Sequence, residues 1–199
     1  YMDDARVIRD GKVVTVRPCD EVVPVGFPAP VGACEAFYSD GLATLLYTQK
    51  GFKSLDELTV RYPGHVEKMK LLIDSGLLSK ERIVVGGLEI SPFEVTAKVL
   101  SEKLSEGDPE DVTVMRVELR GRKGGVDYEL LDYYDEKAGV TSMGKTTGYT
   151  CSIVTQMLGG GDIKGNGVIP PEVAVCGQGV DRLLSELGAR GVRISRKRV

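Results

Sequence analysis

Two long runs of alternating apolar and polar side chains constrain this chain more than any other feature. The runs DVTVMRVELRG and VDYELLDYYD flank the link Arg122-Lys123-Gly124-Gly125. Apolar side chains at every second position predict β-strands, and a short glycine-containing link between two such runs predicts an antiparallel hairpin. We therefore expect a long two-stranded ribbon in the second half of the chain.

A second hairpin is predicted at the start of the chain, in YMDDARVIRDGKVVTV. Two short apolar runs surround Asp10-Gly11, which is a strong signal for a two-residue turn. The sequence thus begins inside an apparent structural element. We expect it to be cut from a longer polypeptide.

Further strands and helices follow from local signals. ACEAFYS and LDELTVRYPG predict strands, and the three prolines between Pro24 and Gly32 predict an extended surface connector. Helices are expected over 42–48, 64–75 and 146–158, in a segment from about Pro171, and after the capping box Ser91-Pro92-Phe93-Glu94. A short strand, Val192 to Ser195, closes the chain. These elements predict an α+β fold, with one mostly antiparallel sheet and helices packed on it.

Composition limits the partners of the chain. Its 199 residues are 42% hydrophobic and 28% charged, with a net charge of -3, which is typical of a globular protein and favours neither nucleic acid nor an anionic membrane as a partner. The basic residues near the end, from Arg190 to Arg198, fit a solvated strand and tail or a nucleic-acid tail. We expect the former.

Cysteine and histidine usage argues against metal and disulfide sites. The four cysteines are far apart in sequence, and His65 is the only histidine, so a structural zinc site is not expected. Unclustered thiols in a chain of this length indicate a reducing compartment. No apolar run approaches the length of a membrane helix and no signal peptide opens the chain. We expect a cytoplasmic protein.

The segment Gly139 to Thr146 matches the phosphate-loop pattern G-x-x-x-x-G-K-[ST]. A phosphate loop joins the first strand of a parallel sheet to a helix, and later strands supply an Asp for magnesium. Here the match lies late in the chain, directly after the antiparallel hairpin, so we do not interpret it as an NTP site. A glycine-rich turn into a helix explains the pattern.

Two candidate sites accompany predicted helix starts. Thr146, Thr147 and Tyr149 lie in or next to the first expected turn of a helix, where free N–H groups favour an anion such as a carboxylate; simple capping by threonine is the alternative. Arg61, Tyr62 and His65, in RYPGHVEK, meet at a strand-to-helix junction. Arginine can grip a carboxylate in a bidentate manner, and histidine titrates near neutrality, which suits an amino acid substrate. A structural or surface histidine is the alternative.

Asp40 is the third candidate. It follows the strand ACEAFYS and precedes Gly41. Its carboxylate could hold a substrate ammonium group, or it could bond to its own backbone in a turn. Both interpretations remain open.

The segments that carry these candidates, CEAFYSDGLATLLYT, LTVRYPGHVEKMKLL and DYYDEKAGVTSMGKTTGYTCSIVTQMLGGGDIKGNGVIPPE, together resemble the saccharopine dehydrogenase-like family, and within it the lysine 6-dehydrogenase branch. The resemblance runs from about Ala5 to Leu187. The motifs RYPGH, TTGY and PPE are its most specific parts. In the relatives the turn before TTGY usually lacks the Gly144-Lys145 pair, so the resemblance implies that this pair arose by chance.

The resemblance implies an NAD(P)-dependent oxidoreductase that acts on an amine carbon of lysine or of a lysine-derived imino acid. Such enzymes carry a dinucleotide-binding domain first and then an α/β domain that binds substrate and forms the homodimer. Nowhere does this chain contain G-x-G-x-x-G; its nearest imitation, CGQGVDR, has Arg182 in place of the third glycine. NAD or NADP is therefore expected to bind mainly to a domain outside this chain.

The resemblance also implies a division of the chain and roles for its residues. Residues 1–168 would form the substrate-binding and dimerisation domain, and 169–199 a helix and strand that pack toward the nucleotide domain. An apolar face of Cys176, Val180 and Leu184 would then be under-covered. His65 would be the base or a substrate ligand, Arg61 would bind the carboxylate and Asp40 the ammonium, with the threonines and Tyr149 on the opposing wall. A non-catalytic module for ligand binding or dimerisation is the alternative.

Overall fold

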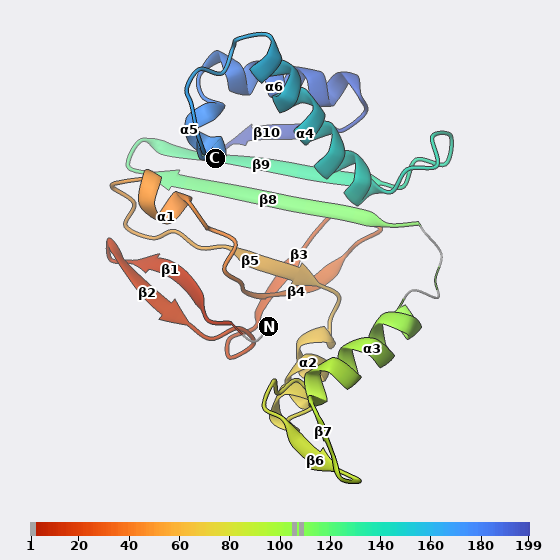
Figure 1. Cartoon of the computed structure of the whole chain (residues 1–199). Coiled ribbons are helices and arrows are strands. Elements are labelled where there is room, and N and C mark those ends of the chain that lie inside the picture. Colours follow the sequence, from red (N-terminus) through yellow and green to blue (C-terminus); the bar gives the residue numbers. More distant parts are fainter. Residues whose placement is uncertain (1–2, 105–106, 108–109) are drawn as a thin grey trace. The chain divides into compact units, whose positions relative to one another are not determined.

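The computed structural model describes residues 3–104, 107 and 110–199, which form two compact units (Figure 1). The first unit spans residues 1–107 and the second spans 108–199. Among the helices of the described residues, none combines the length and apolar character that a bilayer-crossing segment requires.

The first unit opens with the predicted hairpin. Strands β1 (Ala5–Arg9) and β2 (Lys12–Val16) pair antiparallel. Asp10 and Gly11 connect them with φ of 47° and 75°, the left-handed values that a type I′ turn requires at both central positions. The prediction from Asp10-Gly11 is confirmed.

A three-stranded antiparallel sheet follows, in the order β3-β4-β5. Its strands are β3 (Val23–Gly26), β4 (Ala33–Tyr38) and β5 (Leu58–Arg61). The expectation of an unpaired connector from Pro24 is wrong at its start, because Pro24 lies inside β3 opposite Glu35. Proline is tolerated there because β3 is an edge strand, so its missing N–H need not bond to a neighbour.

Two helices belong to this part of the unit, α1 (Leu45–Thr48) and α2 (His65–Asp74). Gly64 precedes α2 with a φ of 85°, a left-handed value that glycine adopts without strain. The expected helix from Gly64 to Ser75 is confirmed. Val66 anchors α2 in a small core with Cys19 and Phe37.

The first unit ends with the hairpin β6 (Ile83–Val85) and β7 (Leu88–Ile90) and with α3 (Pro92–Leu104). The predicted cap of α3 is present, since the Glu94 N–H donates to Ser91 Oγ at 3.4 Å. The helix α3 is only partly covered, with Phe93 and Leu100 half-buried. No residue of the helix is fully buried, and Leu104 is 81% exposed.

The second unit contains the predicted long ribbon. Strands β8 (Val112–Gly121) and β9 (Gly124–Tyr133) pair along their whole length, and β10 (Ile194–Arg198) adds to the other edge of β9. The closing strand thus begins two residues later than expected. Helices α4 (Ser142–Gly159) and α6 (Gln178–Ala189) lie on one side of this sheet (Figure 1).

The core of the second unit lies between that sheet and the helices. Leu130 of β9 packs with Ile153 and Met157 of α4 and with Leu187 of α6. The single helix expected from Pro171 is interrupted: α5 (Pro171–Ala174) ends before Gly177, which takes a φ of 53° at the start of α6.

The α+β prediction is confirmed. The strands differ from the single expected sheet, because those of the described residues form four sheets of two or three strands, in which every pairing is antiparallel. Residues 169–199 contribute β10 to the sheet of the second unit and α6 to its core.

Candidate functional site

Three predicted site residues meet where β5 leads into α2. Arg61 is the last residue of β5, Tyr62 follows it, and His65 is the first residue of α2. Arg61 and Tyr62 are exposed, Tyr62 at 58%, and His65 is half-buried. The junction therefore presents a guanidinium, a phenol and an imidazole within five consecutive residues, all of them reachable from solvent.

Glu35 of β4 completes this junction. It lies directly opposite Arg61 in the β4–β5 register. Its carboxylate accepts from the Gly64 N–H at 3.0 Å and from the Val66 N–H at 2.6 Å. The hydrogen bond from Val66 is the main reason that the pKa of Glu35 is lowered. Because Glu35 satisfies the first N–H groups of α2, a substrate carboxylate here would need a side-chain partner.

His65 packs in parallel on a buried aromatic ring. Its imidazole and the Phe37 ring have centroids 6.5 Å apart and planes inclined by 14°. Burial is the main cause that lowers the pKa of His65. The positive charges of Arg61 and Lys68 lower the pKa further, and the negative charge of Glu35 raises it. His65 is consequently neutral at pH 7 and can accept a proton.

Arg61 has a guanidinium directed at the surface. Its Nη1 donates to the Val60 carbonyl at 2.7 Å. Arg61 forms no ion pair with any residue that the structure describes. Four of its five N–H donors thus remain for a carboxylate.

Asp40, two residues beyond β4, bonds to a cation of the chain itself. Its Oδ2 lies 2.9 Å from Arg6 Nη2, and its Oδ1 accepts from Arg6 Nε at 3.1 Å. The hydrogen bond from Arg6 is the main cause that lowers the pKa of Asp40. Its proposed contact with a substrate ammonium stays a prediction, and it would require exchange with Arg6.

Thr146, Thr147 and Tyr149 lie in the second unit, on α4. This helix begins at Ser142, four residues before the predicted start, so none of the three is at its first N–H groups. The helix-end argument for an anion at these positions is therefore wrong. Thr146 Oγ1 donates to the Ser142 carbonyl at 3.0 Å, Thr147 is exposed, and Tyr149 packs against the core. Their contact with substrate stays a prediction.

The true start of α4 is fully capped. Thr141 Oγ1 accepts from the Gly144 N–H at 3.0 Å. The Asp111 carboxylate accepts from the Ser142 N–H at 2.5 Å and from the Met143 N–H at 2.8 Å. Because all three N–H groups have partners, this helix end offers no ready anion site.

A buried ion pair explains the phosphate-loop match. Lys145 and Asp132 are each 6% exposed, and Lys145 Nζ lies 3.0 Å from Asp132 Oδ1. Ser142, which has no exposed surface, donates through its hydroxyl to Asp132 Oδ2 at 2.6 Å. The lysine points into the protein rather than toward a nucleotide. Lys145 therefore has a structural partner in this fold.

The residues present do not fit a nicotinamide dinucleotide. In CGQGVDR, Gly177 precedes α6 but follows the short helix α5 instead of a strand. Arg182 pairs with Asp162. A dinucleotide fingerprint needs a strand-to-helix turn with an unobstructed helix start. NAD or NADP therefore has no recognisable pocket among these residues.

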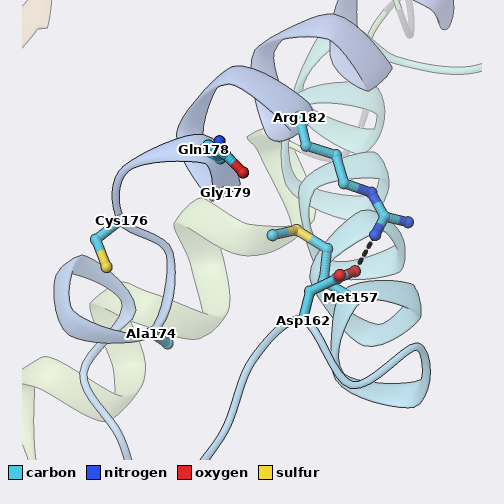
Figure 2. Close-up of a pocket in the computed structure, with 7 residues that line it drawn as sticks. All are labelled: Met157, Asp162, Ala174, Cys176, Gln178, Gly179 and Arg182. Carbon is cyan, nitrogen blue, oxygen red and sulfur yellow. Dashed lines mark hydrogen bonds and ion pairs between the residues drawn. The ribbon is translucent and has the colours of Figure 1, made fainter.

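The same segment lines a pocket of about 500 Å³ in the second unit (Figure 2). Its lining includes Met157 of α4 and the ion pair between Arg182 and Asp162, which Figure 2 marks with a dashed line. None of the predicted site residues lines it. Cys176 and Val180 are exposed and Leu184 is half-buried, which confirms the predicted exposure for the first two. In the described ranges, no three His, Cys, Asp or Glu side chains are placed to share a metal ion.

Sequence reasoning missed Glu35, Asp111 and the buried Lys145–Asp132 pair. Lys145 did leave a signal, because it occupies a stripe at spacing four with three residues that contact the core, Tyr149, Ile153 and Met157. A lysine in such a stripe indicates a buried acidic partner. For Glu35 the signal would have been the register that places it opposite Arg61.

The site geometry can now be compared with known families. The family model of the saccharopine dehydrogenase C-terminal domain matches residues 1–192. The family name identifies an amino acid dehydrogenase, and its C-terminal part corresponds to an oxidoreductase-type substrate-binding module. This agrees with a chain that has an accessible arginine and histidine but no dinucleotide motif. The chain belongs to the saccharopine dehydrogenase C-terminal domain family.

Proposed function

We propose that this chain is the substrate-binding and dimerisation part of an NAD(P)-dependent amino acid oxidoreductase of the saccharopine dehydrogenase or lysine 6-dehydrogenase type, which oxidises an amine-bearing carbon. The observation that carries the proposal is the β5–α2 junction. There Arg61, Tyr62 and His65 are reachable from solvent, and Glu35 accepts hydrogen bonds from the first N–H groups of α2. The family match supports the same class of enzyme.

In the proposed site, Arg61 binds the substrate carboxylate. Its planar guanidinium can form two parallel hydrogen bonds, which fix both the position and the orientation of a carboxylate. Tyr62 lies beside it and can donate one further hydrogen bond. Since Glu35 already satisfies the α2 N–H groups, specificity for a carboxylate depends on Arg61.

His65 accepts the amine proton. Its lowered pKa keeps the imidazole neutral at pH 7, and a neutral base must remove that proton before the amine carbon can be oxidised. The stack on Phe37 fixes the plane of the ring. Only the exposed edge of the ring is then available to the substrate.

Asp40 is the proposed partner of a substrate ammonium group. Its side chain and that of Arg6 are 35% and 38% exposed, and ion pairs at such sites contribute only about 0–1 kcal/mol. A substrate ammonium can therefore replace Arg6 at low cost. Thr146, Thr147 and Tyr149 are proposed for the opposing wall on chemical suitability alone.

The first test is NADH production by the natural full-length polypeptide with L-lysine, in parallel with saccharopine. We expect turnover of one of the two, lost in His65→Ala and in Arg61→Ala, with Arg61→Lys retaining part of it. Isothermal titration of the same amino acids into the chain itself isolates binding from turnover.

A non-catalytic module for ligand binding or dimerisation is the second candidate, and the absence of G-x-G-x-x-G from this sequence is compatible with both candidates. Binding of an amino acid that depends on Arg61, together with no turnover by the full-length polypeptide with either cofactor, would select this alternative. Absence of binding and of turnover would leave the family membership but remove the proposed site.

A further inference from the structure

The pocket of the second unit is not used by the proposed function. Its volume is about 500 Å³, which lies within the usual range of small-molecule sites. The residues that line it lie between Met157 and Arg182, so the second unit forms the pocket by itself. The side chains of this one unit therefore indicate which ligand the pocket suits.

The charged part of the lining is an ion pair. Arg182 Nη1 donates to Asp162 Oδ2 (Figure 2). The two side chains are 40% and 46% exposed, so a ligand can reach both charges. The bond between them uses one of the five guanidinium N–H donors and one of the two carboxylate oxygens. The other guanidinium donors and Asp162 Oδ1 have no partner among the described residues.

The apolar part of the lining consists of Met157, Ala174 and Gly179. Met157 is 1% exposed, so its position is fixed by the core. Gly179 lies inside α6, where glycine costs about 1 kcal/mol relative to alanine. A Cβ at Gly179 would lie 3.3 Å from Met157 Cε. Glycine at this position thus keeps space open between the start of α6 and Met157.

We propose that this pocket binds a free α-amino acid with an apolar side chain, in its zwitterionic form. The ammonium and the carboxylate of an α-amino acid are attached to one carbon, so they can bond to two charges that are in contact. The carboxylate accepts from the remaining donors of Arg182, and the ammonium donates to Asp162 Oδ1. The apolar side chain packs against Met157, and the Gln178 amide can bond to either charged group.

The Arg182–Asp162 pair disfavours other classes of ligand. A simple anion is attracted by Arg182 but repelled by Asp162, and a simple cation meets the reverse. The charged ends of a peptide are several bonds further apart than two groups on one carbon. A zwitterion with neighbouring charges makes four charges alternate, and the bond between Arg182 and Asp162 stays intact. Charge complementarity therefore selects the α-amino acid.

Cys176 provides a direct test, because it lines the pocket and its thiol is exposed. Cys151 is also exposed but is not part of the lining, so it is the internal control. The probe is L-leucine at about ten times its dissociation constant. We expect it to slow alkylation of Cys176 by iodoacetamide about tenfold and to leave Cys151 unaffected. Mass spectrometry of the two cysteine peptides measures both rates.

Two analogues of the probe test the requirement for a zwitterion. Isocaproate has the carbon skeleton and the carboxylate of leucine without its ammonium group. Isoamylamine has the ammonium group without the carboxylate. Each analogue lacks one of the two charged hydrogen-bonding groups, so we expect each to bind at least about tenfold more weakly than L-leucine in isothermal titration.

Variants test the pocket itself. Arg182→Gln and Asp162→Asn each remove one charge, and we expect either to weaken L-leucine binding about tenfold. Gly179→Ala changes no charge and should weaken binding by filling the space beside Met157. Glu186→Gln is the matched control, because Glu186 pairs with Arg190 on the same helix but does not line the pocket. It should bind L-leucine like the wild type, and circular dichroism verifies that every variant is folded.

Three results would overturn the inference. Equal alkylation of Cys176 with and without L-leucine would remove the site. Equal binding of isocaproate and L-leucine would remove the role of Asp162. Binding that survives in the three pocket variants but is lost in Arg61→Ala would locate the ligand in the first unit. None of these measurements requires turnover, so failure here is distinct from failure of the proposed function, which is tested by NADH production.

Discussion

Helices α2 and α4 both begin where a carboxylate from an upstream segment accepts hydrogen bonds from their first N–H groups. Glu35 does this for α2 and Asp111 for α4. The side chains around the two starts differ. Those beside α2 are accessible, whereas Lys145, Asp132 and Ser142 beside α4 are buried.

This difference separates a candidate site at α2 from a structural anchor at α4. A capped helix start cannot bind a substrate anion through its backbone, so function depends on the side chains that remain reachable. At α2 these are a guanidinium, a phenol and an imidazole, and at α4 the ammonium already has a buried carboxylate partner. The sequence that matches a phosphate loop thus lies at the start of α4, where its lysine has a structural role.

The largest expected effect is on the α4 anchor. Lys145→Ala leaves the Asp132 carboxylate buried without its cation, and loss of one partner of a buried pair costs about 3–5 kcal/mol. We expect this decrease in the free energy of unfolding by urea titration. The double variant Lys145→Met/Asp132→Asn removes both charges and should lose less than half as much. Equal losses would show that packing rather than charge is the cause.

Arg61→Ala tests the accessible start. We expect amino acid binding to weaken by about 10–100-fold, because a hydrogen bond to a charged group contributes about 1.5–3 kcal/mol. Stability should change by less than about 0.5 kcal/mol, as is usual at exposed positions. Arg61→Lys keeps the charge but not the planar fork, so it should recover part of the affinity. A variant that binds normally would remove Arg61 from the site.

Local sequence patterns predicted much of the fold, but they did not predict contacts between residues far apart in sequence. The turn at Asp10-Gly11, the cap at Ser91 and the long ribbon follow from residues within a few positions of each other. The Lys145–Asp132 pair joins residues 13 apart, and Glu35 reaches the Val66 N–H across 31 residues. No spacing rule covers such distances, because they depend on strand register and on how a helix rotates toward its sheet.

The candidate site was predicted in part for the same reason. Arg61, Tyr62 and His65 are neighbours in sequence, so their meeting at one junction needed no tertiary information. The predicted start of α4 was four residues late, because the segment before Thr146 was interpreted as a glycine-rich turn. In the structure the Gly144 N–H bonds to Thr141 as part of the cap, which offsets the low helix propensity of glycine.

Removing each capping carboxylate should have a similar, intermediate effect. We expect Glu35→Ala and Asp111→Ala to lower stability by about 1–2 kcal/mol each, the range for loss of a helix cap. Hydrogen exchange should accelerate at the first amides of α2 in one variant and of α4 in the other. Only Glu35→Ala should also change amino acid binding. An effect of Asp111→Ala on binding would contradict the division into site and anchor.

The pKa of His65 should respond in opposite directions to the removal of two of its charged neighbours, Arg61 and Glu35. It is the only histidine of the chain, so one imidazole resonance reports it in NMR. Arg61→Gln should raise the pKa of His65 and Glu35→Gln should lower it, because Arg61 disfavours and Glu35 favours the imidazolium. No change in either variant would show that neither Arg61 nor Glu35 affects the pKa of His65.

The same shifts fix the pH dependence of stability. Both His65 and Glu35 have lowered pKa values in the folded state, so the unfolded chain binds more protons as pH falls, and stability decreases toward acid. The contribution of His65 is complete above about pH 6.5 and that of Glu35 above about pH 4.3, their ordinary values. Glu35→Gln should flatten the lower part of a urea-unfolding series across pH.

The smallest expected effects come from glycines within α4 and directly before α2. Gly148 lies within α4, and a Cβ there would meet no atom within 4 Å, so Gly148→Ala should raise stability by about 0.5–1 kcal/mol through helix propensity. At Gly144 a Cβ would come within 2.9 Å of the Thr141 Oγ1 that forms the cap, so Gly144→Ala should lose that gain. Gly64→Ala, before α2, should destabilise, because its φ of 85° strains any side chain. Thermal unfolding of the three variants ranks them. A stabilising Gly144→Ala would show that the cap of α4 can shift, and would weaken the description of this helix start as a rigid anchor.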